Sequence, residues 1–81
     1  MYDKFLIEAW DDNYQKFEMT ISMPKDLNAN YDPIPAADWL REKVEAISVF
    51  ISGIKVQPNG TWDKTDLLIF NDGEWGPADE C

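Results

Sequence analysis

The chain has 81 residues, with 16 Asp and Glu against 7 Lys and Arg, so its formal net charge is -9 at pH 7. Its hydrophobic content of 44% and aromatic content of 14% exclude a disordered acidic tail, which would be poor in core-forming residues. With no His and one Cys, it lacks the usual parts of zinc sites, His-dependent nucleophilic catalysis and intrachain disulfides. We therefore expect one small folded domain that is not an enzyme and has no catalytic residues, metal site or cofactor.

Two segments near the N-terminus, Lys4–Trp10 and Gln15–Met23, alternate apolar and polar residues and predict a β-hairpin. A three-residue loop at 11–13, with Asn13 in the left-handed conformation, keeps the apolar residues of both strands on one face. A two-residue turn at Asp12-Asn13 would mix the two faces, so the longer loop is favoured. The predicted cross-strand pairs are Ile7 with Phe17, Phe5 with Met19, Glu8 with Lys16, and Trp10 with Tyr14.

The segment from Pro24 to Pro33 is rich in Pro, Asn and Asp and has no period, which predicts a long connection. A helix is expected over about Pro35–Ile47, because Pro suits a first turn and apolar residues recur at helical spacing. The apolar face of this helix comprises Ala36, Leu40, Val44 and Ile47, with Trp39 at its edge.

The β-branched run Ser48–Val56 predicts a strand that is buried on both sides for part of its length, with Gly53 at a bulge or a close backbone approach. A turn at Pro58-Asn59-Gly60 and a last strand from Trp62 to Phe70 follow. The fold class is therefore α+β: a small antiparallel sheet in ββαββ order with one helix packed on one face. We expect one domain over residues 1–73 and an acidic, flexible tail over 74–81.

The negative charge is unevenly distributed along the chain. Residues 1–32 hold seven acids and three bases, giving -4; residues 33–57 balance; and residues 58–81 hold six acids and one base, giving -5. DNA, RNA and anionic membranes are disfavoured as direct ligands, because they are bound through Lys and Arg. A basic, nucleic-acid-binding protein is the favoured partner.

No membrane segment is expected, because the longest apolar stretches, Ala46–Ile51 and Leu67–Phe70, are too short to cross a bilayer. The first residues also lack the pattern of a secretory signal, and the lone Cys81 fits a reducing compartment. These features favour a cytoplasmic protein.

Acids beside aromatic residues make good anchors for a basic partner. The expected partner-binding residues are Asp11, Asp12, Asp63, Asp66, Asp72, Glu74, Trp10, Tyr14 and Trp75. The leading hypothesis is an inhibitor of a basic nucleic-acid-binding protein that imitates nucleic acid, as a viral anti-restriction or anti-CRISPR protein would, by analogy of size and charge. The alternative is a structural or assembly subunit, as a homodimer for example, that uses an exposed sheet face with Leu6, Trp10 and Tyr14.

Overall fold

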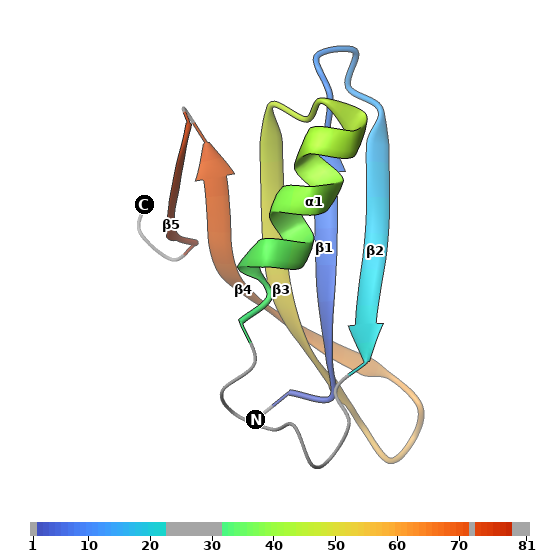
Figure 1. Ribbon diagram of the computed structural model, residues 1–81. Coiled ribbons are helices and arrows are strands. Elements are labelled where there is room, and N and C mark those ends of the chain that lie inside the picture. The colour runs from blue at the N-terminus through green and yellow to red at the C-terminus, as the bar shows by residue number, and fades with distance from the viewer. Residues whose placement is uncertain (1, 23–31, 72, 79–81) are drawn as a thin grey trace.

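A computed structural model of the chain describes residues 2–22, 32–71 and 73–78. These residues form one antiparallel sheet of five strands in the order β2-β1-β3-β4-β5, with one helix, α1, lying across one face (Figure 1). The α+β class and the helix on the sheet are as predicted. The elements are β1 (Lys4–Trp10), β2 (Lys16–Ser22), α1 (Ile34–Val44), β3 (Ser48–Val56), β4 (Trp62–Asn71) and β5 (Glu74–Pro77).

The core lies between α1 and the face of the sheet that it covers. Alternate residues of β1 and β3 point to this face, because side chains of a strand alternate between the two sides. Ala37 and Leu40 of α1 pack onto them, and Met19 and Ile21 of β2 lie at the margin. The buried hydrophobic residues of this cluster are Phe5, Ile7, Ala9, Ala37, Leu40, Val49 and Ile51.

The β1–β2 pairing corrects the predicted register. Ile7 pairs with Met19 and Trp10 pairs with Lys16, so the strands are shifted by two residues and the loop has five residues. Tyr14, with φ 63°, takes the left-handed position expected for Asn13. The shift preserves the faces because a two-residue slip leaves the side-chain alternation unchanged. The predicted Trp10–Tyr14 pair is therefore wrong, although Lys16 still reaches Glu8 diagonally.

Helix α1 ends three residues before the predicted boundary, at Val44. Glu45 adopts the left-handed conformation with φ 54°, and the next amide, that of Ala46, donates to the carbonyl of Arg41. Such a reversal stops a helix by satisfying one of its last carbonyls. Ile47, expected on the apolar face of the helix, consequently lies beyond it and is 56% exposed.

β3 has the predicted bounds, and the predicted close approach at Gly53 is found, whereas the bulge lies opposite Ile51 and Ser52 rather than at Gly53. The pairing of β3 with β4 shifts register between Ile51 and Ser52, which leaves Leu67 of β4 as the extra residue of a bulge. The ring of Tyr2 lies against the backbone of Gly53, where a Cβ atom would be 2.5 Å from Cδ1 of the tyrosine.

The sheet has one strand more than predicted. β5 lies within the segment expected to be a flexible tail, and it pairs with β4 from Leu68–Pro77 to Asn71–Glu74. The indole Nε1–H of Trp75 donates to Oδ1 of Asp38 on α1 at 3.2 Å, and its ring packs on Phe70. This strand was missed because three of its four residues, Glu74, Gly76 and Pro77, are of types depleted in strands, and the segment is held by contacts with distant parts of the chain.

Most of the predicted connection at 24–33, Asp72 and residues 79–81 of the predicted tail lie outside the described residues. Within the described part of the chain, no helix is long and apolar enough to cross a membrane.

Candidate functional site: an aromatic hollow at one end of the sheet

Three connections lie at the same end of the sheet. The register places Trp10 of β1 beside Ser48 of β3, and Val49 of β3 beside Phe70 of β4. The β1–β2 turn, the link from α1 to β3 and the β4–β5 turn therefore all lie at this end (Figure 1). Asp11, Asp12 and Glu45 lie in these connections, and Glu74 is the first residue of β5.

A hollow of about 370 Å³ opens at the same end. We call it the aromatic hollow; it is lined by Trp10, Asp11, Tyr14, Ile47, Ser48 and Phe50. Trp10 and Phe50 project from neighbouring strands on the face opposite α1 and meet edge to face, with ring centroids 5.2 Å apart. The amide of Ile47 donates to the carbonyl of Trp10 at 2.8 Å, which holds the two connections together beside the hollow.

The β1–β2 turn is organised by Asp11. Its Oδ1 accepts the backbone amides of Asn13 at 2.9 Å and Gln15 at 3.0 Å, while its own carbonyl accepts the amide of Tyr14. This arrangement places Tyr14, 87% exposed, at the rim of the hollow in a left-handed conformation. A bulky residue rarely adopts that conformation, which Gly or Asn reaches more easily.

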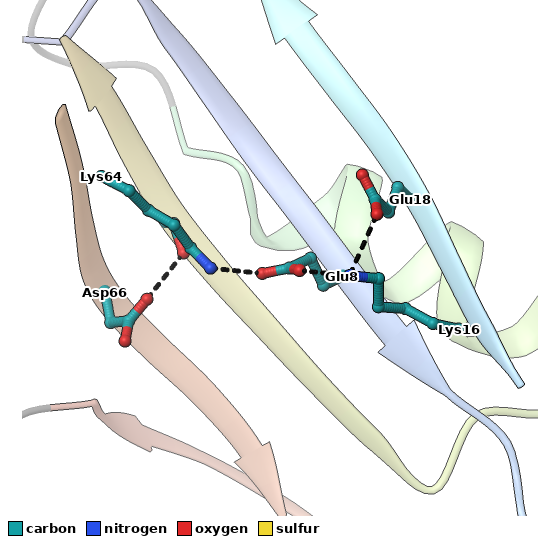
Figure 2. A network of polar contacts seen from close by, with 6 residues as sticks. Glu8, Lys16, Glu18, Lys64 and Asp66 are labelled. Carbon is teal, nitrogen blue, oxygen red and sulfur yellow. Dashed lines mark hydrogen bonds and ion pairs between the residues drawn. The ribbon is translucent and has the colours of Figure 1, made fainter. Parts of the chain in front are cut away.

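A polar network lies next to the hollow on the same face of the sheet. Figure 2 shows Glu8 of β1 between Lys64, at 2.8 Å, and Lys16, at 3.2 Å, with Lys16 also 3.1 Å from Glu18. Glu8 is only 6% exposed, and the buried hydroxyl of Ser52 donates to Asp66 at 2.9 Å. Glu8 and Glu18 lie directly opposite each other, so Lys16 offsets their repulsion.

The network changes the proton affinity of two of its members. Burial by itself raises the pKa of the Glu8 carboxyl, but hydrogen bonds and charge from Lys64 and Lys16 outweigh burial and hold this pKa below its ordinary value. The hydrogen bond to Glu18, followed by the bond to Glu8, raises the pKa of Lys16 above its ordinary value. Glu8 is thus a charged structural group that ties β1 to β2 and β4.

The structure brings some of the predicted partner-binding residues together and separates others. Trp10, Asp11 and Tyr14 line the aromatic hollow, with Asp12 in the same turn. Glu74 and Trp75 line a second hollow of about 260 Å³ along β5. Asp63 lies toward the far end of β4, and Asp66 is engaged by Ser52. Asp72 lies outside the described residues.

Ile47, Ser48 and Phe50 complete the hollow, and sequence reasoning did not select them. Ile47 was assigned to the helix core, and Ser48 and Phe50 to a strand without a binding role. Only the meeting of the two connections shows that they share a site with Trp10. The one available signal was the parity of Phe50, which places it on the face opposite Val49 and Ile51.

Most of the described Lys and Arg side chains contact acidic or aromatic side chains of the same molecule. Lys16 and Lys64 contact Glu8, and Arg41 contacts Asp38. The ammonium groups of Lys4 and Lys43 lie 4.3 and 6.0 Å from the rings of Trp62 and Trp39. The surface therefore presents its surplus of carboxylates to solvent. In residues 2–22, 32–71 and 73–78, no three potential metal ligands are grouped closely enough to hold a metal ion.

Neither family models, curated proteins nor solved structures give a significant match to this chain.

Proposed function

We propose that the chain is a non-enzymatic acidic binding protein that acts in the cytoplasm, where it docks on a basic nucleic-acid-binding protein and competes with nucleic acid. The observation that carries this proposal is the aromatic hollow at one end of the sheet, with Asp11 in its lining and the exposed Asp12 in the same turn. Exposed carboxylates attract a basic surface over distance, and aromatic side chains then supply the contact area. Inhibition of a nuclease-type defence system, as by a viral protein, is the biological setting that fits this chemistry.

The first test is capture of binding proteins by the tagged full chain from nuclease-treated lysate, at low and at high salt. We expect a basic nucleic-acid-binding protein that is lost at high salt and displaced by added DNA or RNA, because screening weakens exposed charge interactions. Capture of only neutral proteins that resist high salt would overturn the proposal.

Two charge reversals locate the docking surface. Asp12→Lys lies at the hollow end of the sheet, and Asp63→Lys lies toward the opposite end of β4; each changes the net charge by the same amount. We expect Asp12→Lys to weaken binding of the captured protein more than Asp63→Lys does. Equal effects would show that overall charge, rather than this end of the sheet, governs binding.

A second candidate function, an assembly subunit, is favoured by the exposure of Tyr14 and the apolar lining of the hollow. Such an interface would bury the hollow against a second copy or a neutral partner and would resist salt. Sedimentation of the free chain at low and high salt separates the two candidates, since self-association that persists at high salt supports only the second.

A further inference from the structure

We infer that the aromatic hollow receives an arginine side chain of the basic partner. This inference rests on the proposed function and names the group that the site recognises. It follows from the rings that line the hollow, from the position of Tyr14 and from the charge at the rim.

The lining of the hollow suits a flat cation. Trp10, Tyr14 and Phe50 present aromatic surface, and the negative face of an aromatic ring attracts a cation placed over it. A guanidinium group is planar and weakly hydrated, so it stacks on rings and leaves water more readily than a lysine ammonium does. Trp10 already attracts a cation within the molecule, because Nζ of Lys16 lies 5.8 Å from its ring centroid.

The rim of the hollow supplies the matching negative charge. Oδ1 of Asp11 accepts the two backbone amides of the turn, and Oδ2 takes no part in those bonds. Asp12 follows it in the same turn and is exposed. The charge of Lys16 is offset by its contacts with Glu8 and Glu18, so it does not reverse the sign of the site. These carboxylates attract a cation that approaches the hollow and give an apolar side chain no such advantage, which favours a cationic occupant.

The exposure and backbone conformation of Tyr14 support the same conclusion. It is almost fully exposed and adopts a conformation that disfavours bulky residues, so its ring contributes little to folding. The exposed ring is therefore accessible to a side chain that enters the hollow.

The test is a titration of the isotope-labelled chain with a short peptide that contains one arginine, followed by NMR at low salt. Matched peptides carry citrulline, which has nearly the same shape without the charge, or lysine. We expect saturable shifts of the Trp10 indole and of the amides at 11–15 and 47–50, with binding of the citrulline peptide weaker by about tenfold.

Tyr14→Asn removes the ring but suits the left-handed conformation, so this variant is expected to fold at least as well as the wild type. It should weaken binding of the arginine peptide by about fivefold. Trp39→Ala, which removes another exposed ring on α1, is the matched control and should leave binding unchanged.

Equal binding of the citrulline peptide, or shifts that avoid the hollow, would overturn the inference. So would full binding by folded Tyr14→Asn. Failure of this inference is distinguishable from failure of the proposed function. If Tyr14→Asn captures a basic nucleic-acid-binding protein as well as the wild type does, only the arginine site is contradicted. If the hollow binds arginine but the chain captures no such protein, only the proposed function is contradicted.

Discussion

Glu8 is a buried carboxylate whose charge is stabilised by two lysines. Glu8→Gln removes the charge that both lysines contact, so we expect the free energy of unfolding to fall by about 1–3 kcal/mol at neutral pH. The loss is limited because Lys16 and Lys64 are partly exposed and regain water. Urea unfolding followed by tryptophan fluorescence measures it, with Glu42→Gln, on the exposed side of α1, as the control.

The same variant has a defined pH dependence. The pKa of Glu8 is lower in the folded chain than its ordinary value of 4.5, so the unfolded chain binds more protons in acid. The stability from Glu8 is therefore fully present above pH 4.5 and is lost as the pH falls through the folded value. The gap between wild type and Glu8→Gln should close in acid; a gap that stays constant there would contradict this account.

Gly53 is required by the ring that covers it. In Gly53→Ala the new Cβ would lie 2.5 Å from Cδ1 of Tyr2, so the ring must move away. We expect a loss of about 1–3 kcal/mol in unfolding free energy, typical of overpacking. Tyr2→Ala in the same chain should remove most of this penalty, which a double-mutant cycle measures. Additive losses would show that the strain comes from another contact.

At the scale of elements, β5 is attached to α1 through one indole. Trp75→Phe keeps the ring on Phe70 but removes the hydrogen bond to Asp38, and we expect a loss of about 0.5–1.5 kcal/mol. Trp75→Ala removes both contacts and should cost about 2–3 kcal/mol. Thermal unfolding measures both, with Trp39→Phe as the control. A Trp75→Ala chain as stable as wild type would show that β5 is dispensable to the fold.

The elements also show what the sequence could predict. The bounds of β3 could be predicted because a long run of β-branched residues by itself favours a strand. The β1–β2 register was missed by two residues, because Tyr14 accepts a left-handed conformation that Asn13 suits better. The candidate site could be predicted only in part. Trp10, Asp11 and Tyr14 were selected as partner-binding residues, but the hollow that they line also includes Ile47. Ile47 reaches the hollow because the helix ends before it, which the sequence did not indicate.

At the scale of the whole molecule, the net charge of -9 acts on a small body with a radius of gyration of 12.9 Å. Repulsion among exposed carboxylates destabilises the folded chain, and the screening length of about 8 Å at physiological salt is shorter than that radius. We therefore expect sodium chloride to raise the melting temperature from low to physiological salt. Calorimetry measures this, and a falling melting temperature would mean that the Glu8 ion pairs outweigh the general repulsion.

The place of β3 at the centre of the sheet has a consequence for how the chain acquires its structure. β1 and β4 both pair with β3, yet β1 and β2 leave the ribosome well before it. A lone two-stranded hairpin is marginal in water, so the N-terminal residues gain a stable sheet only once residues 48–56 have been synthesised. The backbone amides that form the hydrogen bonds between β1 and β3 should then be the last to exchange with deuterated solvent.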